Sequence, residues 1–141
     1  MFFRILSCAA LLAVASPASA EAPSAPPTDP EAVVRAYTDA ANAGDIDRFL
    51  GLYDPAIRKF RFPGQMTSEG VEHNRRTYEK SFAANPDLHV EIVALIRLGD
   101  KVMVRDRVTG LANGGTADEL TVYQVEGGRI TNILYVERIP G

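Results

Sequence analysis

The sequence predicts an α+β domain in which three helices pack on one face of a strongly curved antiparallel sheet. Three observations support this fold class. Helical patterns occupy residues 30–53 and 71–84, a hairpin of two long strands fills residues 88–110, and another pair of long strands runs to residue 138. Helices followed by a run of strands are typical of α+β domains.

The chain has 141 residues, which is enough for one domain. Residues 1–20 have the features of a secretory signal peptide: an early Arg4, an apolar run and the small-residue site Ala18-Ser19-Ala20. The apolar run is too short for a convincing membrane span. We therefore expect a secreted or periplasmic protein with no membrane anchoring after cleavage.

Cleavage after Ala20 would also remove Cys8, the only cysteine, so the mature protein would have no disulfide. Residues 21–28, with the sequence EAPSAPPT, predict a Pro/Ala-rich tether. The domain itself is expected over residues 29–139.

The composition excludes several function classes. The formal net charge of −3 argues against a general nucleic-acid-binding role. The sequence has no phosphate loop, nucleophile elbow or dinucleotide fingerprint. His73 and His89 do not have the spacing of metal ligands, and each is interpreted as a surface or interface residue. We expect no cofactor and no metal.

Two helices open the domain. Asp29 suits the N-cap of the first, Pro30 suits its first turn, and Gly44 ends it. Asp45 can cap a second, short helix that carries Phe49, Leu52 and Tyr53. A weakly alternating strand follows over residues 56–62, and a third helix is expected over residues 71–84.

The strands on either side of Gly99-Asp100 alternate with period two, as paired strands do. A two-residue turn pairs Leu98 with Lys101 and, if the register continues, Ile92 with Arg107. Both faces of this hairpin are partly apolar. A sheet with one face in water would need apolar residues on the other face only. One face should therefore contact the helices and the other a second subunit.

The last two strands, residues 116–126 and 129–138, flank the turn Gly127-Gly128. The same reasoning pairs Glu126 with Arg129 and places Gln124 and Tyr135 on one face.

Three strings carry a family resemblance: VVRAYTDAANAGDIDRFLGLY in the first two helices, SEG before the third, and VYQVEGGRITNILYVER at the end. They resemble the SnoaL-like domains of the nuclear transport factor 2-like superfamily, over residues 29–138. The resemblance implies a cone that encloses a deep, mostly apolar pocket for a hydrophobic small molecule. It also implies a homodimer formed through the outer sheet face.

The resemblance further implies which residues point into the cone. The expected pocket residues are Tyr37, Tyr53, Phe62, Arg105, Arg107, Thr109, Gln124 and Tyr135.

The catalytic patterns of the superfamily match only in part. Asp106-Arg107-Val108-Thr109 resembles the arginine motif of epoxide hydrolases, but Thr109 and Tyr135 stand where the two aspartates would be. Neither residue can deprotonate water as a carboxylate pair can. The remaining catalytic candidates are Arg107, Tyr135, Glu137 and Asp118.

Arg107 has two interpretations on an apolar inner face. It either forms an internal ion pair with Glu137, Asp118 or Glu119, or it binds an anionic group of the ligand. Three functions follow as hypotheses: a binding domain for a small apolar molecule, a lyase, isomerase or hydrolase acting on a hydrophobic carbonyl compound, and a non-catalytic dimerisation or accessory module.

Overall fold

The computed structural model describes residues 25–141, so the expected signal peptide and the start of the tether lie outside the described residues. The described chain forms three α-helices, a short 3₁₀ turn and six strands. In order they are α1 (Pro30–Asn42), α2 (Ile46–Gly51), β1 (Tyr53–Arg61), β2 (Gln65–Glu69), α3 (Val71–Ala84), β3 (His89–Leu98), β4 (Lys101–Thr109), η1 (Ala112–Gly114), β5 (Ala117–Glu126) and β6 (Arg129–Pro140).

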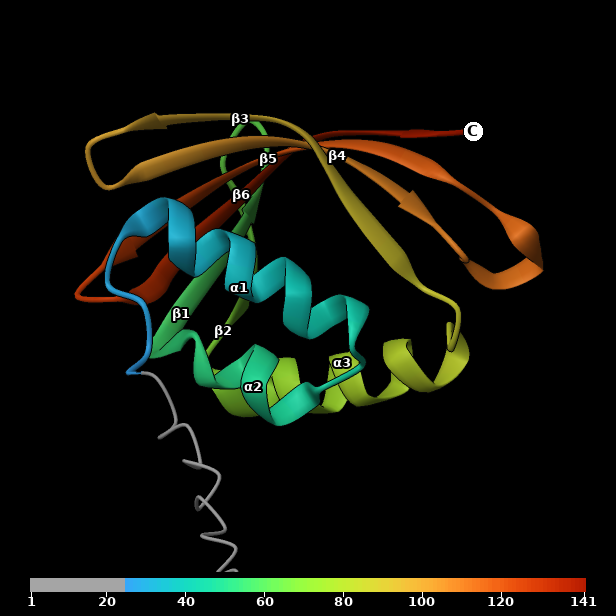
Figure 1. Cartoon of the computed structure of the whole chain (residues 1–141), viewed down its shortest axis with the longest axis horizontal. Helices are drawn as coiled ribbons and strands as arrows, with labels where there is room; N and C mark the ends of the chain where they lie inside the picture. The colour runs from blue at the N-terminus through green and yellow to red at the C-terminus, as the bar shows by residue number, and fades with distance from the viewer. Residues whose placement is uncertain (1–24) are drawn as a thin grey trace, which may run out of the picture.

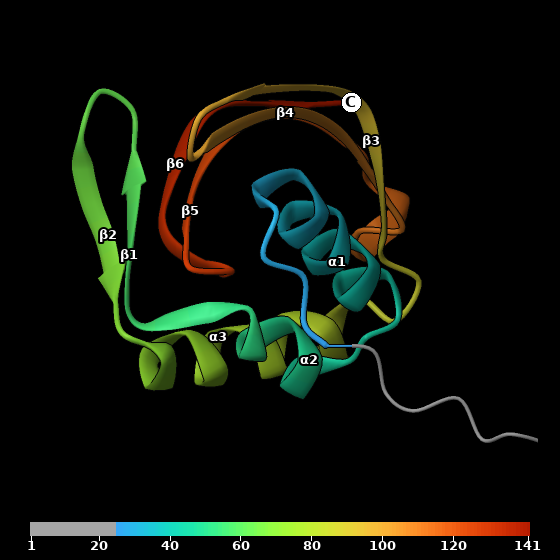
Figure 2. The ribbon, with the colours of Figure 1, turned by 60° about the vertical axis from the view of Figure 1, so that its left-hand side comes forward.

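The six strands form one open sheet in the order β2-β1-β6-β5-β4-β3. The sheet arches over α1, and α2 and α3 lie across the opening of the arch (Figures 1 and 2). β1 runs parallel to β6, and the other pairs are antiparallel, so the sheet is mixed. This is the expected α+β class, with three helices on a strongly curved sheet.

Local sequence signals explain the helix starts. Asp29 caps α1 by accepting a hydrogen bond from the Ala32 amide at 3.1 Å, and Asp45 caps α2 by accepting one from the Arg48 amide at 3.0 Å. α3 occupies the predicted range. α2 is shorter than expected, because the chain becomes extended at Tyr53 and begins β1 there.

The core lies between α1 and the concave face of the sheet. Val33, Val34 and Ala40 of α1 are fully buried, and they belong to the same apolar cluster as Val102 of β4 and Ile133 of β6. Burying each of the valine and isoleucine side chains contributes roughly 1.5–3 kcal/mol relative to exposure.

Three bulges in the long strands produce much of the curvature. Val93 is an extra residue in β3, and Thr131 and Val136 are extra residues in β6. Each bulge bends its strand and increases the local twist. Together they help to turn a flat sheet into the wall of a cone.

The same bulges overturn part of the predicted register. Leu98 pairs with Lys101 and Glu126 with Arg129, as predicted near the two turns. Beyond Val93, however, Ile92 pairs with Asp106 and not with Arg107. The expected pairing was wrong because an extra residue shifts every later partner by one position.

β2 has no counterpart among the predicted strands. It forms a hairpin with β1 around the turn at Pro63-Gly64 and is the edge strand next to β1. Its residues are mostly exposed, so its sequence has no apolar alternation to mark a strand.

Candidate functional site

A cavity of about 700 Å³ opens between the concave face of the sheet and the helices. Aromatic rings form much of its wall: Tyr37, Phe49, Phe62, Tyr78, Phe82, Tyr123 and Tyr135. Several of these rings pack on one another; Tyr37 stacks on Phe49 with centroids 4.2 Å apart, and Phe49 meets Tyr78 edge-on at 4.7 Å. This part of the wall is therefore a packed aromatic surface.

A buried lysine lies behind two of the wall tyrosines. Lys59 of β1 is only 3 % exposed. Its Nζ atom donates a hydrogen bond to the Tyr78 hydroxyl at 2.7 Å, and that hydroxyl is 3.2 Å from the hydroxyl of Tyr135. The ammonium group also lies over the rings of Tyr53 and Tyr78, with centroid distances of 4.8 and 4.2 Å.

This arrangement shifts the acidity of both partners. Burial lowers the pKa of the Lys59 ammonium, although its contact with Tyr78 opposes that effect. Burial raises the pKa of the Tyr78 hydroxyl, but the positive charge of Lys59 and the hydrogen bonds at this oxygen outweigh it, so the pKa lies below its usual value. Burial instead raises the pKa of Tyr135 well above its usual range.

Another part of the wall presents a pair of carboxyl groups. Asp106 of β4 and Glu119 of β5 are cross-strand neighbours, and both side chains line the cavity. Arg138 of β6 holds Glu119 in an ion pair of 3.2 Å. Asp106 is 4 % exposed, and its Oδ1 atom has no hydrogen-bond partner among residues 25–141.

The environment of Asp106 makes its carboxyl group a weaker acid than that of an exposed aspartate. Burial raises the pKa of its carboxyl group, and the neighbouring charge of Glu119 raises it further, to about 6. A carboxyl group with a pKa near neutrality can both accept and return a proton, which is what general acid–base catalysis requires.

Four of the sequence-predicted residues contribute to the cavity wall: Tyr37, Phe62, Tyr135 and Glu137. Phe62 is 62 % exposed and therefore lies at the rim. Tyr53 lies behind the wall, where its hydroxyl is 2.6 Å from that of Tyr37.

The other predicted residues lie on the convex outer face. Arg105, Arg107 and Thr109 alternate with the buried Val104, Asp106 and Val108, so they point away from the cavity. The nitrogen atoms of Arg105 and Arg107 lie 3.8 and 3.7 Å from Asp118, which faces the same side. The ion-pair interpretation of Arg107 therefore holds with Asp118, but on the outside of the cone.

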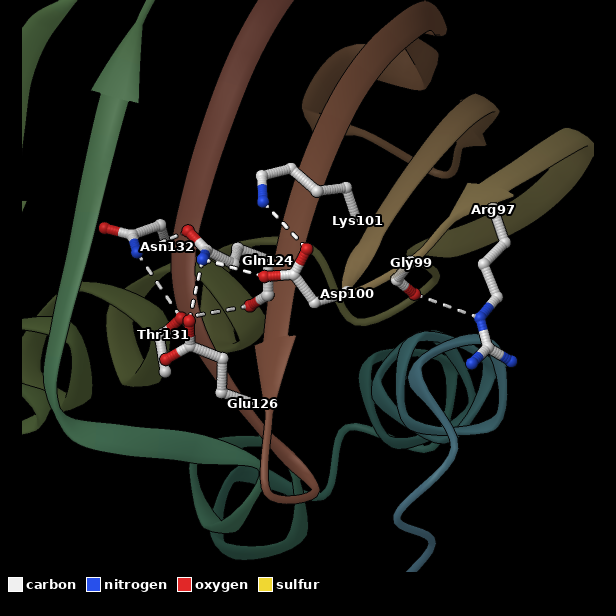
Figure 3. Close-up of polar contacts among 8 residues, drawn as sticks. All are labelled: Arg97, Gly99, Asp100, Lys101, Gln124, Glu126, Thr131 and Asn132. Atoms are coloured by element: carbon white, nitrogen blue, oxygen red, sulfur yellow. Dashed lines mark hydrogen bonds and ion pairs between the residues drawn. The ribbon is translucent and has the colours of Figure 1, made fainter.

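Gln124 also lies outside the cavity, in a polar cluster that holds the β3–β4 turn against β5 and β6 (Figure 3). Its amide nitrogen donates to Asp100 at 3.0 Å and to Glu126 at 2.8 Å. Its amide oxygen accepts from Asn132 at 3.0 Å.

The expected inner face of β4 was thus the wrong one. Three valines share a face with Asp106, whereas the opposite face carries Arg105 and Arg107. The apolar alternation was the signal that marked the inner face, and it would have identified Asp106. Lys59 had a weaker signal, since it lies two residues after the buried Ile57 on the same face of β1 but is itself charged.

The described part of the chain offers neither a metal site nor a membrane-spanning helix. Within residues 25–141, no three histidine, cysteine, aspartate or glutamate side chains are arranged to hold a metal ion. No helix in the same range is both long enough and apolar enough to cross a bilayer.

Comparisons with known proteins agree with this geometry. A cystatin-fold protein from Novosphingobium aromaticivorans shares 27 % identity with a TM-score of 0.67, covering 74 % of this chain and 95 % of that one. A protein from Sinorhizobium meliloti, described as a candidate polyketide cyclase, shares 23 % identity with a TM-score of 0.62 and coverages of 73 % and 92 %. A protein from Kribbella flavida, described as a candidate ketosteroid isomerase, shares 17 % identity with a TM-score of 0.64 and coverages of 79 % and 83 %.

A search of curated proteins found no match. The family model of the SnoaL-like domain, however, matches residues 34–133, which is most of the chain. That range includes most of α1, all of α3, the carboxyl pair and most of the cavity wall. The chain therefore belongs to the SnoaL-like domain family.

Proposed function

We propose that this domain binds a small, largely apolar molecule that carries a carbonyl oxygen. The cavity of about 700 Å³ is the observation that carries the proposal, because its size is that of a site for a drug-sized ligand. The aromatic wall suits the apolar body of such a ligand. The hydrogen-bonded hydroxyl groups of Tyr78 and Tyr135 can together supply one donor for an oxygen atom of the ligand.

The test is binding of 2-tetralone, a two-ring ketone, measured by titration calorimetry and ligand-detected NMR. We expect one saturable site per chain. Replacing Ala41, a small residue of the cavity wall, in the variant Ala41→Phe should fill the site and abolish binding. The exposed Ala83→Phe variant on α3 should bind normally. If the unmodified protein shows no saturable binding of two-ring ketones or hydrocarbons, the proposal is wrong.

A second candidate function is proton transfer on the bound molecule, and Asp106 favours it. Its carboxylate would take a proton from the carbon next to the carbonyl group. The electron pair of that C–H bond would form a carbon–carbon double bond, and the carbonyl π pair would move to the oxygen, where a tyrosine hydroxyl stabilises the enolate. Return of the proton from Asp106 to another carbon would complete an isomerisation. In a cyclisation the enolate carbon would attack a second carbonyl, and the proton on Asp106 would pass to the alkoxide oxygen that forms.

Two structural relatives described as a candidate polyketide cyclase and a candidate ketosteroid isomerase support this second function. It is tested by NMR in D₂O, where proton abstraction appears as loss of the signal from hydrogens next to the carbonyl of 2-tetralone. We expect Asp106→Asn to slow this exchange by about 100-fold or more, since general-base catalysis contributes that much.

Asp118→Asn is the matched control, because it removes a carboxylate from the outer face. It should exchange the ketone at the rate of the unmodified protein. Equal rates for Asp106→Asn and the unmodified protein would rule out Asp106 as the base, while the binding proposal would stand.

We also propose that the mature protein is secreted or periplasmic. Residues 1–20 support this through the pattern of a cleaved leader. N-terminal sequencing of the protein from its native compartment should find Glu21 as the first residue. An intact N-terminus in the cytoplasm would contradict it.

A further inference from the structure

In the hydrogen bond between Lys59 and Tyr78, the donor and the acceptor can be assigned. A lysine ammonium has three donors and no acceptor, so the Tyr78 oxygen must accept at the 2.7 Å contact. The Tyr78 and Tyr135 hydroxyls, 3.2 Å apart, share one hydrogen bond. Only one of the two hydroxyl protons is used in that contact, which leaves the other available to a further acceptor, such as a ligand oxygen in the cavity.

Lys59 lies behind the two tyrosines and not in the cavity wall. Lys59 is 3 % exposed and does not line the cavity, whereas both tyrosines do. The ammonium group therefore has no direct contact with a ligand in the cavity, and its hydrogen-bonded route to one runs through the tyrosine hydroxyls. Hydrogen bonds of this kind are polarised along the chain, and they are stronger in a site that excludes water.

We propose that Tyr78 and Tyr135 form a subsite for a negatively charged oxygen of the ligand, a phenolate or an enolate, and that Lys59 is the positioning residue behind it. This inference rests on the proposed function, since it names the ligand oxygen that the same cavity accepts. Asp106, in the wall of that cavity, can receive the proton that a phenol or enol gives up on binding as an anion. The proton lost by the ligand neutralises the Asp106 carboxylate, so the net charge of the cavity with its ligand does not change.

The test measures the affinity of the full domain for 1-naphthol, 4-chloro-1-naphthol and 4-nitro-1-naphthol, whose acidity rises in that order. Naphthalene is the neutral probe of the same cavity. For the unmodified protein we expect affinity to increase with acidity. We also expect bound 4-chloro-1-naphthol to show the absorption band of its anion at neutral pH, where most of the free probe is protonated.

The Lys59→Met variant keeps the length of the side chain and removes its charge. It should bind 4-nitro-1-naphthol about ten- to hundredfold more weakly, as expected for loss of a charge-assisted hydrogen-bond network. It should bind naphthalene unchanged and lose the dependence on acidity. Lys80→Met removes an equal charge from the exposed face of α3 and should behave like the unmodified protein.

Tyr78→Phe and Tyr135→Phe keep the ring packing and remove one hydroxyl each, so they test the subsite if Lys59→Met fails to fold. Each should weaken binding of the acidic naphthol more than that of naphthalene. If these variants or Lys59→Met retain the full dependence on acidity, the subsite is wrong. If naphthalene itself does not bind the unmodified protein, the proposed function fails first.

Discussion

Asp106 is a carboxyl group that folding removes from water while leaving its Oδ1 atom without a hydrogen-bond partner in residues 25–141. Such a group costs folding free energy when it is charged. The carboxylates of Glu119 and Glu137 and the guanidinium of Arg138 line the same cavity, and Tyr123 lines it as well. Residues with this cost are expected at functional sites, where the perturbed acidity is used.

The pKa of Asp106 predicts how stability depends on pH. The folded protein binds the proton more tightly than the unfolded chain, because the pKa rises from 3.8 to about 6. The contribution of Asp106 to the free energy of unfolding is therefore most favourable below pH 4 and falls as pH rises to 6, by up to ~3 kcal/mol.

Asp106→Asn removes that charge. We expect the variant to be more stable than the unmodified protein at pH 8 and to lose the advantage at pH 4, as measured by urea unfolding. A stability difference that does not change with pH would contradict the raised pKa.

Asn42 joins the end of helix α1 to the edge strand β3. Its side-chain oxygen accepts from the Val90 amide at 2.7 Å, and its side-chain nitrogen donates to the Val90 carbonyl at 2.9 Å. The amide group thus takes the place of a neighbouring strand at a point where β3 would otherwise have a free edge.

We expect Asn42→Ala to lower the free energy of unfolding by about 2–3 kcal/mol, because two partly buried backbone groups lose their partners. Thermal and urea unfolding measure the change. Asp39→Ala, an exposed substitution on the same helix, should stay within about 0.5 kcal/mol. Equal effects of the two substitutions would show that the contact does not contribute.

Gly110 follows β4 in a conformation that depends on the absence of a side chain. Its φ of +68° lies in the left-handed region, and a Cβ atom would lie 1.8 Å from the Asp87 carbonyl oxygen. Gly110→Ala must therefore displace the loop between α3 and β3, and we expect a loss on the order of 3 kcal/mol or more in urea unfolding.

Gly99→Ala is the control for that prediction. Gly99 has a similar φ of +62°, but a Cβ atom at this position would have no neighbour within 4 Å among the described residues. We expect the substitution to cost only the backbone strain of roughly 1–2 kcal/mol. If Gly110→Ala lowers the free energy of unfolding no more than Gly99→Ala does, the loop moves aside for the methyl group and the prediction is wrong.

An apolar row crosses the convex face of the sheet from one edge to the other. Its members are cross-strand partners, one from each strand in sheet order: Met66, Phe60, Leu134, Val122, Met103 and Ile96. Ile96 and Met66 are 60 % and 54 % exposed. An apolar strip of this length in contact with water is typical of an interaction surface.

We predict that a second copy of the chain covers this row, as expected from the two apolar faces of the hairpin. Sedimentation should find a dimer at micromolar concentration, and Met103→Glu should convert it to a folded monomer, because a charge would be buried in the interface. Ala83→Glu adds the same charge on α3 and should leave the dimer intact. A monomeric unmodified protein would contradict the prediction.

Local interactions specify the helices and the two hairpins of long strands, and these could be predicted from the amino-acid sequence. Asp29, Asp45 and the glycine turns mark where helices and hairpins begin or end, and alternation marks the strands. The family strings lie within these elements, so the fold class followed from them. Pairing near the two turns was also predictable, because a short loop fixes the register of the residues beside it.

Long-range contacts, by contrast, decide which residues face the cavity, and these became visible only in the folded chain. Bulges at Val93, Thr131 and Val136 shift the strand pairing, and a shift of one residue exchanges the two faces of a strand. Arg107 and Gln124 lie outside because β4 and β5 turn their other, buried faces toward the helices, and Asp106 and Lys59 lie inside, where each has neighbours far away in the sequence. Sequence patterns report the period of a strand, whereas the bulges and the buried contacts between α3, β1 and β6 arise only when the sheet curves around the helices.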